Sequence, residues 1–125
     1  MIPASQAAGP RGGETAAQPT VFVCGECPGG AGRLARIRAV LEGQGAAVAA
    51  SACLGGCRSG ASVAIRAPGG MAYLFGPVDD EEIACLPMLI ALYRAAPAGA
   101  IADARPLGAL RLRLLARIPA VPPPS

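Results

Sequence analysis

Two pairs of cysteines follow two short segments of strand-forming residues, and this arrangement constrains the fold more than any other feature. The run TVFVC, Thr20 to Cys24, ends in the first cysteine of the pair Cys24 and Cys27, and the run AAVAASACL contains Cys53, the first of the pair Cys53 and Cys57. Residues of these types, bounded by glycine, are typical of short buried strands. The sequence therefore predicts that each cysteine pair lies at the carboxyl end of a strand.

The segment between the two pairs predicts a helix. In RLARIRAVLEGQG, the apolar side chains recur at helical spacing, whereas Arg33, Arg36 and Arg38 fall off that face. Gly43 and Gly45 end the helix. A strand, a helix and a second strand form a crossover unit whose strands are parallel neighbours. We expect the carboxyl ends of the two strands, and hence both cysteine pairs, at one edge of the sheet.

The rest of the chain predicts a hairpin and further helices. Val63 and Ile65 alternate in one strand, a Pro68-Gly69 turn follows, and Tyr73 and Phe75 lie on one face of the return strand. The segment 79–96 starts with four acids and continues as a helix, which either kinks at Pro87 or begins its regular part just before it. The leucine spacing in 105–118 predicts a short amphipathic C-terminal helix. The expected fold is an α/β thioredoxin-like sandwich, β-α-β-β-(β)-α with that extra helix.

Composition predicts one domain with tails. The chain has 125 residues, of which 53% are hydrophobic, which suits a single collapsed domain. We expect a disordered tail over residues 1–19, a metal- or cluster-binding domain over 20–118 and a Pro-rich tail over 119–125. Four aromatic residues leave the core to smaller side chains, so cross-links between loops matter for stability.

Charge and the N-terminal sequence limit the partners and the location. The net charge of +3 arises from eleven arginines without any lysine, and these form no basic run, so we expect no nucleic-acid surface. The first residues lack the pattern of a signal peptide, and no apolar stretch reaches membrane-spanning length. We expect a cytoplasmic protein without a membrane partner. In a reducing compartment, five cysteines indicate metal binding or catalysis rather than disulfides.

Four thiols at one sheet edge predict a four-sulfur site formed by Cys24, Cys27, Cys53 and Cys57. Such a site suits a [2Fe–2S] cluster or tetrahedral zinc, and another use of the thiols stays open. The glycines around both pairs favour iron modestly, because they let backbone N–H groups approach sulfur. Arg58, next to Cys57, would offset the negative charge.

The segment CLGGCRSGASVAI, followed by MAYLFGPV and a helix that starts with acids, resembles the second half of the thioredoxin-like [2Fe–2S] ferredoxins. In that family the last two ligands lie in a C-L-G-x-C loop before a hairpin. The resemblance implies that Cys53 and Cys57 are cluster ligands and that Cys24 is the first ligand. Cys27 departs from the pattern, because it follows Cys24 after two residues whereas the ferredoxins have a longer spacer.

The whole stretch from Val21 to Ile118, with VCGEC, CLGGC, YLFG and LRLLARIP, is similar to an uncharacterised bacterial family of small predicted metal-binding proteins. Its layout is like that of the ferredoxins. For some of its members, this resemblance also implies a link to cobalamin or cobalt metabolism.

The sequence supports two function classes and, less strongly, a third. The chain is a [2Fe–2S] one-electron carrier or cluster-bearing accessory, or it is a four-cysteine zinc or transition-metal accessory. The third is a thiol oxidoreductase that uses the C-x-x-C pair, although Pro28, Gly29 and Gly30 move the helix start past Cys27. A dinucleotide or phosphate loop is disfavoured, because the chain has no lysine and no acid follows near position 52.

Other residues receive simpler interpretations. We expect no catalytic residue, because the chain has no histidine and so lacks the usual triads and the commonest general base. The acids from Asp79 to Glu82 complement a helix dipole, and Cys85 is a core residue. We expect a protein partner that exchanges electrons or metal with this chain. The arginines of 33–38 could steer it, although a solvated helix face explains these arginines more simply. The leucines of the C-terminal helix close the domain or a homodimer.

Overall fold

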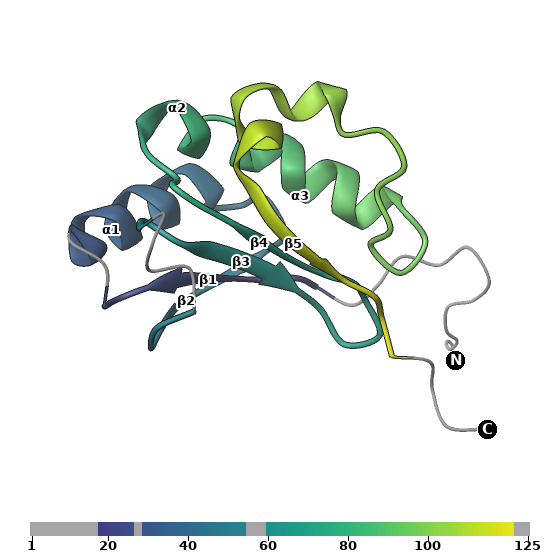
Figure 1. The fold of residues 1–125 in the computed structure, drawn as a ribbon, viewed down its shortest axis with the longest axis horizontal. Coiled ribbons are helices and arrows are strands. Elements are labelled where there is room, and N and C mark those ends of the chain that lie inside the picture. Colours follow the sequence, from purple (N-terminus) through teal and green to yellow (C-terminus); the bar gives the residue numbers. More distant parts are fainter. Residues whose placement is uncertain (1–17, 27–28, 55–59, 122–125) are drawn as a thin grey trace.

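The computed structural model describes residues 18–26, 29–54 and 60–121. They form an α/β fold with a five-stranded mixed sheet and three α-helices (Figure 1). The sheet order is β2-β1-β3-β4-β5, in which the strands are β1 (Thr20–Cys24), β2 (Ala47–Ser51), β3 (Val63–Arg66), β4 (Ala72–Phe75) and β5 (Leu114–Ile118). The β1–β2 pair is parallel, and the other pairs are antiparallel.

The crossover from β1 to β2 confirms the predicted β-α-β unit. Helix α1 (Gly30–Leu41) connects the two strands, and its buried residues are spaced by three or four positions: Gly30, Arg33, Ile37 and Leu41. Gly43, at a φ of 75°, follows the helix. It adopts the left-handed conformation that glycine tolerates best.

The predicted hairpin and the helix after it are also present. β3 and β4 pair antiparallel, with Val63 opposite Phe75 and Ile65 opposite Tyr73, and all four side chains are buried. The segment rich in acids is broken into α2 (Asp80–Ile83) and α3 (Leu86–Ala95), with Pro87 in the first turn of α3. The regular helix thus begins just before Pro87, where the missing N–H costs nothing.

The C-terminal helix is only partly present. Arg105–Arg113 form the 3₁₀ segment η1, which is kinked at Gly108 (φ 59°, ψ −127°), but Leu114–Ile118 form β5. Strand β5 pairs antiparallel with β4, with Ala72 opposite Ile118 and Leu74 opposite Ala116. The prediction of a helix through Ile118 was therefore wrong, because a helix this short is marginal by itself, whereas the open edge of β4 pairs with the segment as a strand.

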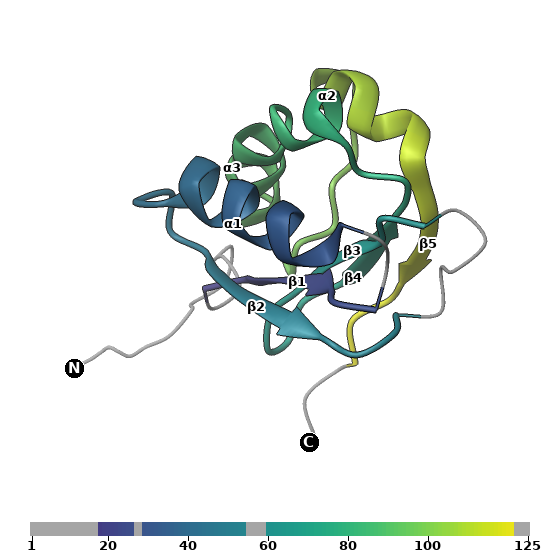
Figure 2. The same cartoon turned by 90° about the vertical axis from the view of Figure 1, so that its left-hand side faces the viewer.

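The helices lie on one side of the sheet, as Figures 1 and 2 show. The core between them and the sheet includes the fully buried Tyr93, Ile37, Leu86 and Leu89. A row of side chains crosses all five strands in register: Ala49, Phe22, Ala64, Leu74 and Ala116. Each is partly exposed. In the described part of the chain no helix is drawn over that side of the sheet.

No helix of the described residues is both long enough and apolar enough to span a bilayer. Most of the expected N-terminal tail, residues 1–17, lies outside the described residues, as does the end of the C-terminal tail. Pro19 is buried, and its carbonyl accepts a hydrogen bond from the Ala47 N–H at 2.9 Å.

Candidate functional site

Cys24 is the last residue of β1 and is held by the backbone on both sides. Its N–H donates to the Ser62 carbonyl at 3.1 Å, and the next N–H, from Gly25, donates to the Ser51 carbonyl at 2.9 Å. The residue is 1% exposed. The Cys24 backbone is thus fixed between the segment that enters β3 and the end of β2.

Cys53 leaves the same edge of the sheet. In the parallel β1–β2 ladder, Cys24 is in register with Ser51, and Cys53 follows Ser51 by two residues and is exposed. Neighbouring strands lie about 4.8 Å apart, so the two cysteine-bearing turns start side by side. The parallel pairing that the sequence predicted is confirmed for the strands that carry both pairs.

Cys27 and Cys57 lie outside the described residues. Among the residues that the structure describes, no three His, Cys, Asp or Glu side chains are grouped as a metal site. With two of its four members outside this part of the chain, the four-cysteine set stays a prediction.

The amino end of α1 packs directly against Cys24. A Cβ on Gly30 would come within 2.9 Å of the Cys24 carbonyl oxygen and 3.2 Å of the Gly25 carbonyl oxygen, a distance that only glycine allows. Gly29, with a φ of 76°, precedes the helix and caps it without a side chain. The first N–H groups of a helix have no partner within it and carry its positive dipole end. This end of α1 can therefore stabilise negative charge on thiolates beside it.

Gly25 differs from the sequence expectation. Its N–H was expected among the amides that could face sulfur, but it continues the ladder to the Ser51 carbonyl. Strand β1 has the predicted bounds, Thr20–Cys24, and the Gly25 N–H just beyond it is used by this backbone bond.

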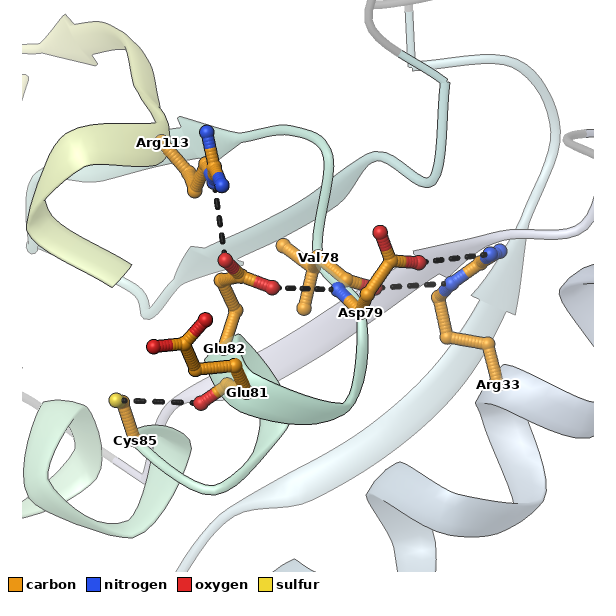
Figure 3. Close-up of polar contacts among 7 residues, drawn as sticks. All are labelled: Arg33, Val78, Asp79, Glu81, Glu82, Cys85 and Arg113. Atoms are coloured by element: carbon orange, nitrogen blue, oxygen red, sulfur yellow. Dashed lines mark hydrogen bonds and ion pairs between the residues drawn. The ribbon is translucent and has the colours of Figure 1, made fainter. Parts of the chain in front are cut away.

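Arg33, expected on the solvent side of the helix, is buried at 6% exposure. Its Nε donates to the Val78 carbonyl at 3.1 Å, and its Nη2 lies 3.9 Å from Asp79 Oδ1 (Figure 3). The start of α2 lies against this turn of α1, so the guanidinium satisfies a buried carbonyl instead of facing water. Val78 in turn donates its N–H to the Ala61 carbonyl at 3.0 Å, which connects the arginine to the chain that follows Cys57.

Glu82 forms a second buried polar contact at the same end of the sheet. Its Oε1 accepts the Asp79 N–H at 2.9 Å, which completes a capping box, and its Oε2 accepts Arg113 Nε at 3.0 Å (Figure 3). Burial by itself raises the pKa of the Glu82 carboxyl, but the Asp79 N–H and the Arg113 guanidinium outweigh it and lower that pKa below the ordinary 4.5. Glu82 therefore joins α2 to the end of η1.

The other acids of this run and Cys85 have structural partners. Asp80 Oδ1 lies 3.0 Å from Arg36 Nε, which agrees with an interpretation of the acids as helix-start residues. Cys85 lies at the break between α2 and α3, partly buried against the core, with its Sγ 3.5 Å from the Glu81 carbonyl oxygen (Figure 3). The sequence placed Cys85 within one helix, and the structure places it between two.

These contacts define what the site can do. The sheet edge brings together two cysteine-bearing turns and a helix N-terminus. The bond from Arg33 to the Val78 carbonyl connects α1 to the chain that enters α2, and the Arg113–Glu82 pair connects α2 to η1. Sequence reasoning missed Arg33 and Glu82. The signal for Arg33 was its spacing of four residues from Ile37, and the signal for Glu82 was its place three residues after Asp79.

The model of a family described as proteins of unknown function, DUF1636, matches residues 21–120. The chain belongs to this family, which confirms the expected membership of an uncharacterised family. Neither the curated proteins nor the solved structures contain a match to this chain.

Proposed function

We propose that this member of the DUF1636 family binds a [2Fe–2S] cluster through Cys24, Cys27, Cys53 and Cys57, and serves as a one-electron carrier or a cluster-bearing accessory. The observation that carries the proposal is the register of the parallel ladder, in which Cys24 is paired with Ser51, two residues before Cys53. Both cysteine pairs thereby begin at adjacent strand ends. Four thiolates match the ligand set of such a cluster.

The described part of the site fits this group in chemistry and charge. Thiolate ligands and cluster sulfides would carry net negative charge, which the N-terminus of α1, packed on the Cys24 backbone, would help to offset. Cys24 is buried and Cys53 is exposed, so one ligand faces the protein and the other faces solvent. When bound, the cluster supplies reversible uptake of one electron. The residues around it hold the ligands in place and set the exposed side, where a protein partner docks.

The sheet topology supports the thioredoxin-like assignment. The order β2-β1-β3-β4, with a parallel first pair and an antiparallel hairpin, is the layout that the resemblance to the thioredoxin-like ferredoxins implies. Strand β5 and segment η1 are then additions at the β4 edge.

A zinc or transition-metal accessory is the second candidate, because four thiolates at adjacent strand ends equally suit a tetrahedral ion. In this case the protein delivers or holds metal for a metallation partner, and a link to cobalt or cobalamin metabolism belongs to this candidate. Dithiol exchange by Cys24 and Cys27 is less well supported. Helix α1 begins at Gly30, three residues beyond Cys27, and Cys24 belongs to the strand.

Serine variants of each cysteine test the proposal and separate these candidates. Cys24→Ser, Cys27→Ser, Cys53→Ser and Cys57→Ser should each lower the iron and sulfide content of anaerobically purified protein. Cys85→Ser, outside the proposed set, should leave that content unchanged. If Cys53→Ser and Cys57→Ser retain full iron and sulfide, the four-cysteine site is wrong. If the same series lowers zinc alone, the second candidate replaces the first.

A further inference from the structure

A small cavity lies on the helix side of the sheet, away from the β1–β2 edge. It is enclosed by β4, β5, η1 and the chain around 101–104, and its volume is about 120 Å³. Buried side chains form its floor: Tyr73, Phe75, Leu89 and Leu107. Two exposed arginines, Arg111 and Arg117, form part of its rim. The cavity therefore has an apolar interior and a cationic entrance.

The polar group of the floor is already engaged. The Tyr73 hydroxyl donates to the Gly99 carbonyl at 2.6 Å and accepts the Ile101 N–H at 2.9 Å. The other floor side chains carry no polar atoms. A molecule that enters the cavity therefore meets hydrocarbon and aromatic surface, and it gains most by placing its own apolar part there.

The rim carries positive charge that the described side chains do not pair. Arg105 is bound to Asp103 at 2.9 Å, and Arg113 is bound to Glu82 at 3.0 Å. Across residues 18–26, 29–54 and 60–121, no carboxylate lies within 4.0 Å of the guanidinium of Arg111 or Arg117. Asp103 is the acid that Arg111 influences, but Arg105 is the main cause of its lowered pKa. Two guanidiniums thus remain for an anion.

Arg117 is oriented by the cavity wall. It is paired with Tyr73 across the β4–β5 ladder, and its Cζ lies 5.9 Å from the centroid of the Tyr73 ring. A guanidinium over an aromatic face is held by the ring's negative surface and keeps its N–H edge free for hydrogen bonds. This placement puts a potential bidentate donor at the rim of an apolar pocket.

We propose that this cavity binds a small organic carboxylate whose apolar body is a single ring or a short hydrocarbon chain. Apolar cavities of about 150 Å³ take a benzene molecule, so a volume of this order admits one ring or a few methylene groups. The carboxylate would lie at the rim between Arg111 and Arg117, and the apolar body would cover Phe75 and Leu107. This inference is independent of the cysteines and holds with or without a metal centre.

Calorimetric titration of the full chain with hexanoate and benzoate tests the proposal, with hexanol and benzyl alcohol as uncharged probes of matched size. We expect saturable 1:1 binding of a carboxylate, and binding of the matched alcohol that is weaker by about tenfold or more, because a charge-assisted hydrogen bond is lost. The double variant Arg111→Gln/Arg117→Gln should weaken carboxylate binding by at least the same factor. Arg94→Gln, an exposed arginine at the end of α3 outside the cavity, should leave it unchanged.

Three outcomes would overturn the proposal: no saturable binding of either acid, equal binding of acid and alcohol, or full binding by the double variant. Thermal unfolding of the unliganded variants establishes that they are folded. If the double variant is unfolded, Ala102→Trp, at an exposed position on the rim, replaces it as the decisive variant. Its bulk should block the entrance and abolish carboxylate binding, and retained binding would contradict the assignment of the cavity.

Discussion

Cys24 and Ser51 lie opposite each other as the last paired residues of two parallel strands. Because Ser51 is followed two residues later by Cys53, this pairing brings the two cysteine-bearing segments to one edge of the sheet. The Gly25 N–H extends the ladder by bonding to the Ser51 carbonyl at 2.9 Å, so the edge is fixed by backbone hydrogen bonds rather than by flexible side chains. A ligand set built at this edge would be held in a defined place.

The contact between α1 and Cys24 predicts different effects for two glycines of the same helix. Gly30→Ala should destabilise the protein by about 1–3 kcal/mol, because the new Cβ meets the Cys24 carbonyl oxygen at 2.9 Å. Gly32→Ala should be neutral or stabilise by up to about 1 kcal/mol, since Gly32 is exposed and its Cβ would meet only the mobile end of Arg36 at 3.5 Å. Urea unfolding measures both. Equal changes in the free energy of unfolding for the two substitutions would show that the start of α1 is not packed closely against Cys24.

The burial of Arg33 predicts an asymmetry between two arginines on α1. Arg33→Met should cost about 1–3 kcal/mol, because it leaves the buried Val78 carbonyl without the Nε donor at 3.1 Å. Arg36→Met should change the free energy of unfolding by about 0.5 kcal/mol or less, since both Arg36 and Asp80 are solvent-exposed. Chemical unfolding of the two variants at neutral pH checks this. A larger loss for Arg36→Met would contradict the packing of α1 against α2.

The lowered pKa of Glu82 predicts that the protein loses stability in acid. Its folded-state pKa is lowered, so its contribution is fully present above the ordinary value of 4.5 and is lost as the pH falls through the lower folded value. Glu82→Gln should therefore be less stable than the parent at pH 7, by about 1–3 kcal/mol, and the difference should shrink below pH 4.5. Asp80→Asn, at an exposed position of the same helix, is the control. Unfolding curves between pH 3 and 7 measure the difference, and one that stays constant with pH would refute the role of the Glu82 charge.

Local patterns were sufficient for the first four strands and for α1. TVFVC, the apolar face of the helix and the Pro68-Gly69 turn each determine their own conformation, and the crossover rule fixes the parallel β1–β2 pair. Leu114–Ile118 could not be assigned in this way. The leucine spacing there fits a helix, but Gly108 interrupts it, and β4 offers an unpaired edge that lies about 40 residues away in sequence. Pairing partners so distant leave no local signal.

The site was predictable to the extent that it depends on strand ends. The positions of Cys24 and Cys53 follow from the order of the elements, whereas the burial of Arg33 and Glu82 depends on how α2 meets α1 and η1. Charged residues are rarely buried unless paired, so composition alone points Arg33 toward solvent. Only the packing of α1, α2 and η1 against one another supplies the partners of Arg33 and Glu82.

The central claim is that four cysteines at this edge hold a [2Fe–2S] cluster. Visible absorption of protein purified without oxygen, before and after dithionite, together with iron, sulfide and zinc content, tests it most directly. We predict a red-brown protein that bleaches on reduction and contains about two iron and two sulfide per chain. A colourless protein with one tightly held zinc, or one without metal, would contradict the claim.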